Sequence, residues 1–261
     1  MLLAIDIGNT CVDLGLFSMV PTAPTPSAGI AWQLNYHAKH PTHATTCDEL
    51  QHLFASLPSS LMGAAIGSVV AGLADTYADL CQPLCQGPVV QLSGRSAWDL
   101  GINYDDPDHV GVDRLAAAAA ARRLAPEGRA AIVADAGTAL TIDAIDANGT
   151  FLGGAIAPGL RLGLQALNSG TSLLPEIEPD PSAPLIGNTT ADGLRSGALY
   201  GSAALVEGLC ARMTVELGVP TTVFFTGGNA PILQPLVSGI DICDTALVLR
   251  GLAQAYSWYV S

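Results

Sequence analysis

One sequence pattern occurs twice and constrains the fold more than any other: an apolar run that ends in aspartate, glycine and threonine. The first copy is segment 2–10, Leu-Leu-Ala-Ile-Asp-Ile-Gly-Asn-Thr, and the second is segment 132–138, Ile-Val-Ala-Asp-Ala-Gly-Thr. Apolar runs of this kind predict buried strands. Further strands are expected at 11–17 and 140–145, so each copy predicts a β-hairpin with an Asp, Gly, Thr turn.

The residues of these turns suit a phosphate group. Glycine lets the backbone come close to a ligand. Backbone N–H groups and a threonine hydroxyl can donate to phosphate oxygens, and aspartate can hold Mg²⁺ directly or through water. Glycine and asparagine also form ordinary turns. The repetition after an apolar strand favours the first interpretation, in which two facing turns grip the phosphates of a nucleotide.

The composition limits the class of protein. A chain of 261 residues with 49% hydrophobic residues can form one large or two moderate domains. The net charge of −13 argues against nucleic acid or an anionic membrane as a partner. Met1 leads directly into a strand, and no apolar run is long enough to span a bilayer, so a cytoplasmic protein is expected. The six scattered cysteines predict reduced thiols and no zinc site.

The basic residues exclude two common ways of binding ATP. Lys39 is the only lysine, and no Gly-Lys-Ser/Thr or Val-Ala-Ile-Lys segment occurs. A Walker P-loop is therefore excluded and a protein-kinase fold is disfavoured. The sequence places no lysine near a phosphate-type turn. ATP would then be bound by Mg²⁺, backbone amides, hydroxyls and an arginine.

Strands and helices alternate along the chain, which predicts an α/β architecture. Residues 20–29 are rich in proline, serine and threonine and predict a loop between hairpin strands. His37, His40 and His43 follow. Pro41 would break a helix that aligned them, so a solvated loop is favoured over a metal site.

A polar loop at 103–107 leads to Asp113 and Arg114 and then to an alanine-rich helix over 115–124. Asp113 suits the macrodipole at a helix start, which is a purely structural role. The functional alternative is a carboxylate and a guanidinium presented together at a cleft. The local sequence does not separate these two interpretations.

A long helix is predicted from Ala191 to about Leu217. It carries Gly193, Gly197 and Gly201 on one face. Glycine lowers helix stability, so this stripe indicates the close approach of another helix. That helix could belong to the same chain, which is the favoured interpretation, or to a second subunit. After the strand at 221–226, Gly227-Gly228 could leave bare backbone for an adenine or ribose.

Together these motifs resemble those of the type III pantothenate kinases, a family of the acetate and sugar kinase, Hsp70 and actin superfamily. The matching segments keep the family's order over nearly the whole chain: 6–10, Tyr104 with 111–114, 135–139, 153–159, 186–190 and 226–228. The resemblance implies an α/β fold of two ribonuclease-H-like (actin-like ATPase) domains, 1–112 and 113–261. Their mixed sheets would be flanked by helices, with the active site in the interdomain cleft, and the protein would be a homodimer.

The resemblance also implies transfer of the ATP γ-phosphoryl group to the 4′-hydroxyl of pantothenate, the first step of coenzyme A biosynthesis. It implies Asp113 as the catalytic proton acceptor, Asp135 as the ligand of a monovalent cation, K⁺ or NH₄⁺, and Asp6 near the Mg²⁺ of ATP. The implied ATP contacts are Asp6, Ile7, Gly8, Asn9, Thr10, Cys11, Val12, Asp13 and Thr138. The implied pantothenate contacts are Tyr104, Gly111, Val112, Asp113, Arg114 and Thr190.

Two alternatives stay open. One is a related kinase that phosphorylates another small hydroxy acid. The other is a non-catalytic nucleotide-binding regulator on the same fold, because a fold does not determine a function. Asp113 beside Arg114 argues against the regulator, which would need no base.

Overall fold

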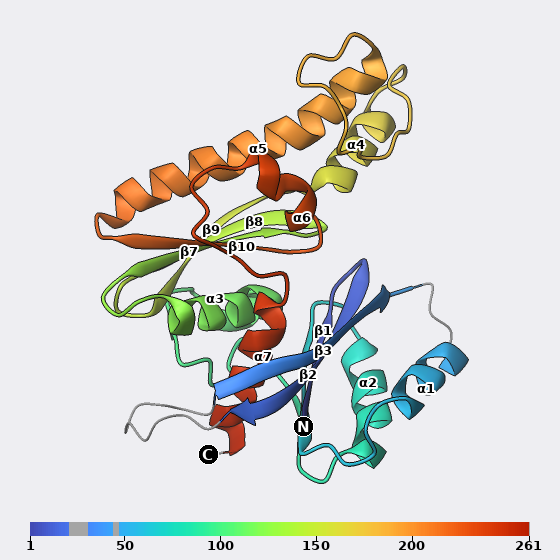
Figure 1. Ribbon diagram of the computed structural model, residues 1–261, viewed down its shortest axis with the longest axis vertical. Coiled ribbons are helices and arrows are strands. Elements are labelled where there is room, and N and C mark those ends of the chain that lie inside the picture. Colours follow the sequence, from blue (N-terminus) through green and yellow to red (C-terminus); the bar gives the residue numbers. More distant parts are fainter. Residues whose placement is uncertain (21–30, 44–46, 261) are drawn as a thin grey trace. The chain divides into compact units, whose positions relative to one another are not determined.

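The computed structural model describes residues 1–20, 31–43 and 47–260 (Figure 1). The proline-rich loop predicted at 20–29 therefore lies, beyond Val20, outside the described residues. The chain forms two compact units. Unit 1 comprises Met1–Leu124 with Ala246–Ser261, and unit 2 comprises Ala125–Thr245. No helix among the described residues is long and apolar enough to cross a membrane.

Unit 1 is built on a mixed five-stranded sheet with the order β3-β2-β1-β4-β5. Strands β1, β2 and β3 are antiparallel neighbours, whereas β4 and β5 run parallel to β1. Its elements are β1 (Leu2–Ile7), β2 (Cys11–Val20), β3 (Ala31–Pro41), α1 (Cys47–Ala55), β4 (Gly63–Ser68), α2 (Leu73–Cys81), β5 (Val89–Gln91), β6 (Gly101–Ile102), α3 (Val112–Leu124) and α7 (Leu247–Val260), with short 3₁₀ turns at Gln82–Leu84 and Pro107–His109.

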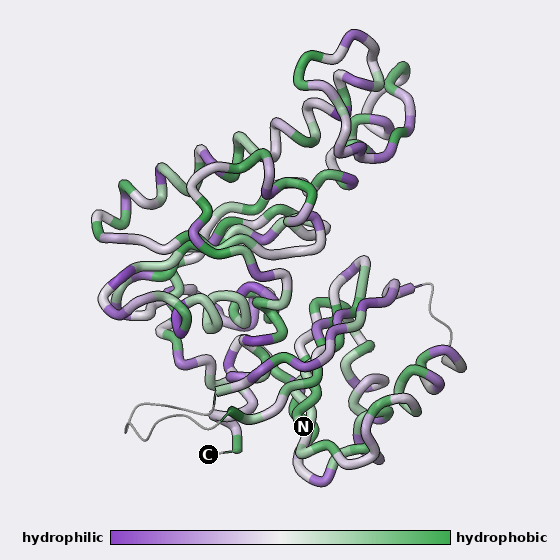
Figure 2. Tube along the Cα trace, viewed as in Figure 1, coloured by the Kyte–Doolittle hydropathy of each residue, from purple (hydrophilic) through white to green (hydrophobic). Residues whose placement is uncertain are grey.

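Helices cover both faces of this sheet. Alternate β1 side chains, Leu3, Ile5 and Ile7, pack with residues of α1 and α2 in one core. The hydrophobic start of the chain is visible beside the N label in Figure 2. The opposite face contacts α7. Leu252 of α7 lies so close to Gly67 of β4 that a Cβ added at Gly67 would be 2.9 Å from its side chain. Asp6 is on this second face, since it alternates with Ile5 and Ile7.

Helix α3 packs closely on α7, and the alanine run makes this possible. Ala116–Ala121 are all buried, and any side chain at Gly251 would collide with the backbone of Ala116. These contacts group α3 and α7 with the N-terminal sheet. The compact units therefore divide the chain after Leu124 and again before Ala246, whereas the sequence predicted a division at 112/113.

Unit 2 repeats the sheet of unit 1. The strands that belong to this unit follow the order β11-β10-β7-β8-β9, with the same antiparallel meander, β7-β8-β9, and two strands parallel to the first, β10 and β11. Its elements are β7 (Ala130–Ala136), β8 (Ala139–Ile145), β9 (Thr150–Pro158), α4 (Leu160–Gly170), α5 (Thr190–Leu217), β10 (Thr221–Thr226), α6 (Ala230–Leu233), a 3₁₀ turn at Gln234–Leu236 and β11 (Ile242–Cys243). The core of the unit lies between this sheet and α5.

The predicted fold class is confirmed, with two mixed sheets flanked by helices in the ribonuclease-H-like order. Both predicted hairpins form: β1 pairs with β2, and β7 with β8. The loop predicted around the histidines is wrong for residues 37–41, which continue β3 to Pro41. The reason is that β3 pairs with β2 along its whole length, so the sheet overrides the weak strand preference of His-Ala-Lys-His-Pro.

Candidate phosphate-binding turns and the start of helix α3

The first turn joins β1 to β2 and is held by backbone bonds. The Gly8 N–H donates to the Cys11 carbonyl at 3.0 Å. Thr42, just beyond β3, donates from its hydroxyl to the Gly8 carbonyl at 2.6 Å and from its N–H to the Thr10 carbonyl at 3.0 Å. Asn9 and Thr10 are exposed. The turn is thus fixed from behind, while its tip is accessible to a ligand.

A row of residues crosses the sheet of unit 1 just before this turn. Gly67, Asp6, Asp13 and Lys39 are direct cross-strand partners on β4, β1, β2 and β3. Directly paired residues project from the same face of a sheet. The Lys39 ammonium lies 2.9 Å from Asp13 Oδ2. The expectation that no lysine lies near a phosphate-type turn is therefore wrong, because strand register brings in a residue distant in sequence.

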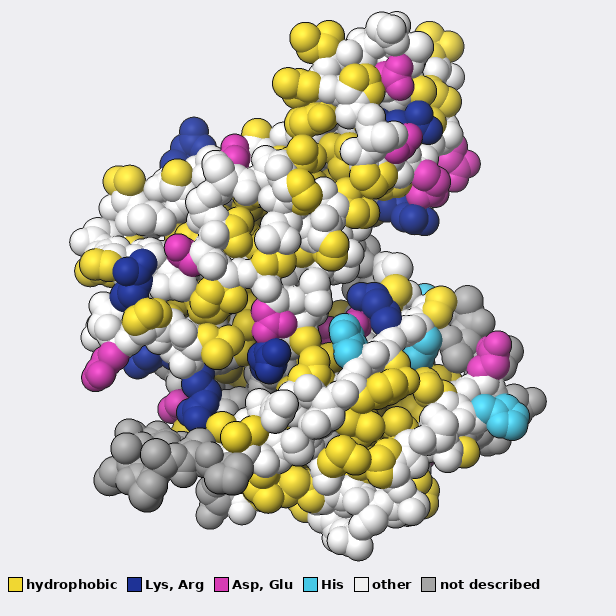
Figure 3. Space-filling view, viewed as in Figure 1, with side chains coloured by type: hydrophobic (Ala, Val, Ile, Leu, Met, Phe, Trp, Pro, Cys, Tyr) yellow, Lys and Arg dark blue, Asp and Glu magenta, His cyan; other side chains and the backbone are white. Residues whose placement is uncertain are grey.

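The three histidines do not form a cluster. His37 Nε2 lies 2.7 Å from Asp13 Oδ1, His40 stacks on Tyr77 with ring centroids 6.1 Å apart, and His43 is exposed. Among the described residues, no group of three or more His, Cys, Asp or Glu side chains could hold a metal ion. Figure 3 shows histidine, basic and acidic side chains gathered over the β2–β3 pair on the face in view.

The start of α3 presents Asp113 and Arg114, both partly buried, in its first turn. Asp113 Oδ1 accepts a hydrogen bond from the Arg114 N–H at 2.8 Å. A side chain at Gly111 would collide with that same oxygen, so any other residue here would displace the Asp113 carboxylate. A Cβ at Gly67 would lie 3.0 Å from Val112, so α3 begins beside the end of the row that contains Asp6.

The loop before α3 is fixed by Arg95. Its guanidinium donates to Asp108 Oδ2 at 2.6 Å and to Asp106 Oδ1 at 2.9 Å. Asp106 also caps the short 3₁₀ turn by accepting from the Asp108 N–H at 3.1 Å. Asp106 therefore has a structural role. Tyr104, in the same loop, is exposed.

The second turn joins β7 to β8 in unit 2. The Gly137 N–H donates to the Ala139 carbonyl at 3.0 Å, and the Asn229 side chain donates to the Gly137 carbonyl at 3.1 Å. The Gly159 N–H donates to the Thr138 carbonyl at 3.1 Å. Thr138 itself is exposed. This turn, like the first, is fixed by residues distant in sequence and leaves its tip open.

Gly227 does not leave the bare backbone that the sequence suggested for an adenine or ribose. It has a φ of +94°, and a side chain there would collide with the Asp135 carboxylate and the Ala136 backbone. Its lack of a side chain instead lets the end of β10 pack against the second turn.

Asp135 and Thr226 could hold a cation. They are direct partners on β7 and β10 and therefore project from the same face. The Thr226 hydroxyl is buried, at 1% exposure for the residue, and among the described residues it has no hydrogen-bond partner. A buried polar atom without a partner is destabilising. A carboxylate beside such a hydroxyl is a fitting oxygen-ligand set for a cation.

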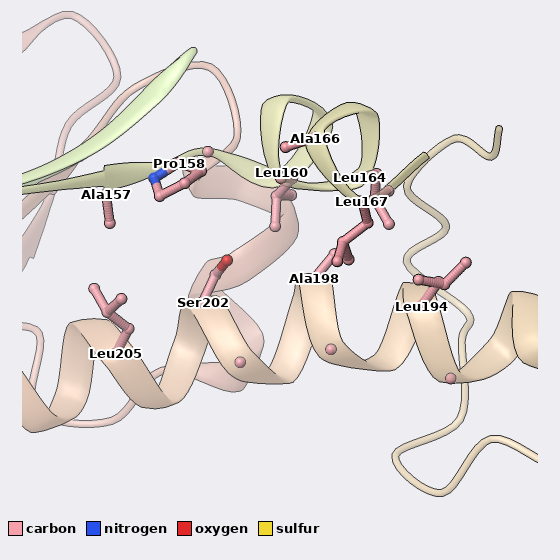
Figure 4. Close-up of a pocket in the computed structure, with 15 residues that line it drawn as sticks. Ala157, Pro158, Leu160, Leu164, Ala166, Leu167, Leu194, Ala198, Ser202 and Leu205 are labelled. Atoms are coloured by element: carbon pink, nitrogen blue, oxygen red, sulfur yellow. The ribbon is translucent and has the colours of Figure 1, made fainter. Parts of the chain in front are cut away.

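Thr190 is the first residue of α5 and is exposed. The preceding Thr189 caps the helix by accepting from the Asp192 N–H at 3.1 Å. Farther along α5, Gly193, Gly197 and Gly201 line an apolar groove of about 460 Å³ against α4 (Figure 4). A Cβ at any of these three glycines would meet nothing within 4 Å. The close internal helix that the sequence favoured is therefore absent at the stripe within the described part of the chain.

Unit 1 thus brings together Asp6, Asp13 and the α3 start, and unit 2 brings together Asp135 and Thr138. Sequence reasoning missed the roles of Lys39, Thr42, Asn229 and Thr226. No local pattern marks them, because each acts through strand register or a contact across many residues.

Comparisons with known proteins agree with this description. A family model described as "Type III pantothenate kinase" matches residues 2–212. A type III pantothenate kinase of Anaeromyxobacter sp. (strain K) is 35% identical over 97% of each chain. That of Rubrobacter xylanophilus is 35% identical over 98% of this chain and 97% of the relative.

Solved structures share the fold at lower identity. A structure from Campylobacter jejuni, described as a Baf family transcriptional activator, has a TM-score of 0.59 at 19% identity and covers 99% of this chain and 98% of that one. The ethanolamine utilization protein EutJ from Carboxydothermus hydrogenoformans has a TM-score of 0.50 at 14% identity, with 97% and 88% covered. These two similarities concern the fold alone.

Proposed function

This chain belongs to the type III pantothenate kinase family, and we propose that it transfers the γ-phosphoryl group of ATP to the 4′-hydroxyl of pantothenate. The product would be 4′-phosphopantothenate, formed in the first step of coenzyme A biosynthesis. One observation supports the proposal beyond the family: in unit 1 the start of α3, with Asp113 and Arg114, lies beside the row of residues that crosses the sheet just before the first turn. We further propose a cytoplasmic location, where ATP is available.

Asp113 is the proposed general base. Its carboxylate would take the proton of the 4′-hydroxyl as that oxygen attacks the γ-phosphorus. Arg114 would bind the carboxylate of pantothenate in a bidentate pair and so orient the hydroxyl. Further pantothenate contacts are proposed at Tyr104, the backbone of Gly111 and Val112, and Thr190.

Residues of both turns are proposed to bind ATP. Backbone N–H groups and hydroxyls of residues 8–13 would donate to phosphate oxygens, and Thr138 is a further proposed ATP contact. The Mg²⁺ that accompanies ATP neutralises charge that develops on the phosphate oxygens. Asp6 would hold it, and one carboxylate suits this ion, which usually shares its ligands with phosphates and water.

A monovalent cation is proposed at Asp135, with the Thr226 hydroxyl as a second oxygen ligand. We expect turnover to depend on K⁺ or NH₄⁺, and we expect K⁺ to raise the melting temperature of the wild type but not of Asp135→Asn. The measurements are initial rates and thermal unfolding in K⁺, NH₄⁺ and Na⁺ buffers at equal ionic strength. Full activity in Na⁺ alone, or an equal K⁺ shift in the variant, would contradict this site.

A homodimer is proposed through the groove between α4 and α5. The groove is apolar, its glycines leave room for another helix, and nearby side chains such as Leu173 and Ile186 are 90% and 85% exposed. Exposed apolar surface of this kind marks interaction sites in soluble proteins.

The variant Gly197→Leu tests this interface. A leucine would occupy the space that a partner helix needs, and overpacking of this kind typically costs about 1–3 kcal/mol. We expect the dimer dissociation constant to rise about fivefold to 150-fold in sedimentation equilibrium. Val215→Leu, at an 81% exposed position of α5, is the control and should leave association unchanged. A wild type that is monomeric at micromolar concentration would disprove the dimer.

The experiment for the function supplies ATP, Mg²⁺ and K⁺ and compares pantothenate with glycerate and pantoate as acceptors. We expect ADP release that requires pantothenate. Release with another hydroxy acid instead would favour the related kinase. Binding of MgATP without any ADP release would favour the non-catalytic regulator.

A further inference from the structure

The single lysine of this chain has an unusual position. Lys39 lies on β3, and its ammonium is 2.9 Å from Asp13 Oδ2, with 44% of the side chain exposed. His37, two residues earlier, binds the other oxygen of the same carboxylate, Oδ1, at 2.7 Å. One carboxylate thus anchors two potentially cationic groups, and the ammonium is still accessible to a ligand.

Strand register places this ammonium at the first turn. Lys39 is the direct partner of Asp13, and Asp13 is the direct partner of Asp6, so all three side chains share one face of the sheet. Neighbouring Cβ atoms in such a row are about 4.5–5.5 Å apart. Three residues after Lys39, Thr42 holds the carbonyls of the turn itself. The segment that carries Lys39 is therefore held to the first hairpin at two points, by the pairing of Lys39 with Asp13 and by the hydrogen bonds of Thr42.

The carboxylates beside the first turn create a need for a positive charge, which Lys39 can supply. Asp6 and Asp13 lie on the strands that flank the turn, and two carboxylates there would repel a triphosphate. Burial alone would raise the pKa of Asp13, but hydrogen bonds from His37 and Lys39 hold the pKa below its ordinary value. Burial alone would lower the pKa of Lys39, but its hydrogen bond to Asp13 and the negative charge of that carboxylate, with a smaller contribution from Asp6, raise the pKa above its ordinary value. The ion pair is therefore charged at neutral pH.

We propose that Lys39 is a phosphate-binding residue for MgATP and that Asp13 is a positioning residue that aims the ammonium at the first turn. The proposal rests on the proposed function in taking ATP as the ligand. It gives Asp13 a different role from the direct ATP contact that the family resemblance implies. A lysine at this place supplies the compact positive charge that neither turn motif contains.

The second unit provides an internal comparison. The corresponding row there is Thr226, Asp135, Thr141 and Ile156, on β10, β7, β8 and β9. Thr141 stands where unit 1 has Asp13, and Ile156, which is 64% exposed, stands where unit 1 has Lys39. The sheet architecture therefore forms without the ion pair. Within the described residues, the row of unit 1 contains a basic side chain, Lys39, and the row of unit 2 contains none.

The experiment is calorimetric titration with MgATP, which needs no acceptor. Lys39→Met removes the charge and keeps the length of the side chain. We expect MgATP affinity to fall about tenfold to a hundredfold, as for loss of a charge-assisted hydrogen bond, with partial recovery in Lys39→Arg. Arg212→Met makes the same change in net charge on exposed α5 of unit 2, where the guanidinium donates to the Gly208 carbonyl, and should bind as the wild type does.

The role of Asp13 is tested by the double variant. If Asp13 acts through Lys39, Asp13→Asn should weaken MgATP binding only when Lys39 is present, and the losses should not add. Additive losses would overturn the positioning role.

A folded Lys39→Met variant that binds MgATP within twofold of the wild type would overturn the proposal, even if the protein phosphorylates pantothenate. If the wild type forms no phosphopantothenate, the proposed function fails, and the effect of Lys39 on MgATP affinity is still measured. A wild type that binds no MgATP would overturn both.

Discussion

The variant Asp113→Asn is expected to lower kcat by at least about a hundredfold, because a general base typically contributes about 10²- to 10⁴-fold. Asparagine keeps the size of the side chain and an oxygen that can accept from the Arg114 N–H, as Oδ1 does at 2.8 Å in the wild type. It cannot take the proton of the acceptor hydroxyl. The melting temperature and MgATP affinity should therefore stay near the wild-type values.

The structural interpretation of Asp113 predicts the opposite pattern. As a helix-start charge alone, it would contribute only about 0.3–1 kcal/mol to stability, and its loss would leave turnover normal. Steady-state kinetics and thermal unfolding of the same preparation separate the two. A folded variant within about tenfold of the wild-type kcat would exclude Asp113 as the base. Asp105 would then be the next candidate, since Asp106 binds Arg95.

The variant Asp6→Ala is expected to abolish turnover of MgATP. Asp6 lies at the end of β1, partly buried, and it is the direct partner of Asp13 across the hairpin and of Gly67 on β4. Its carboxylate is the proposed Mg²⁺ ligand, and the neighbouring carboxylate of Asp13 is already paired with His37 and Lys39. Stopped assays of ADP over long incubations give the sensitivity that a near-complete loss requires.

Asp79→Ala is the matched control for this variant. Asp79 is an exposed aspartate on α2, so the same truncation there should leave kcat and KM unchanged. Circular dichroism should show the same secondary structure for both variants. Turnover retained by a folded Asp6→Ala protein would move the Mg²⁺ site away from the first turn.

The sheet strands and their turns could be predicted because their signals are local. The apolar runs before Asp6 and Asp135 are long enough to indicate buried strands, and the glycines that follow mark the turns. The alanine-rich helix predicted over 115–124 is also present, although it begins earlier, at Val112. The alanine run could be recognised in the sequence, but its structural role could not be predicted. It lets Gly251 of α7 approach Ala116, a contact between positions far apart in the chain.

The site residues that could not be predicted depend on register or tertiary packing. Lys39 reaches the first turn only because β3 continues through the histidine segment and pairs with Asp13. Thr226 becomes a potential cation ligand only through parallel pairing with Asp135. Gly227 was visible as a glycine, but its packing against Asp135 required the fold.

The most direct test of the central claim is product stoichiometry. The purified chain is incubated with ATP, Mg²⁺, K⁺ and pantothenate. ADP is quantified, and phosphopantothenate is identified by mass spectrometry and located at the 4′ oxygen by ³¹P-coupled NMR. We expect one 4′-phosphopantothenate for each ADP in the wild type, and almost none of either product in Asp113→Asn. ADP formed without 4′-phosphopantothenate, or equal product formation by the wild type and Asp113→Asn, would contradict the assignment.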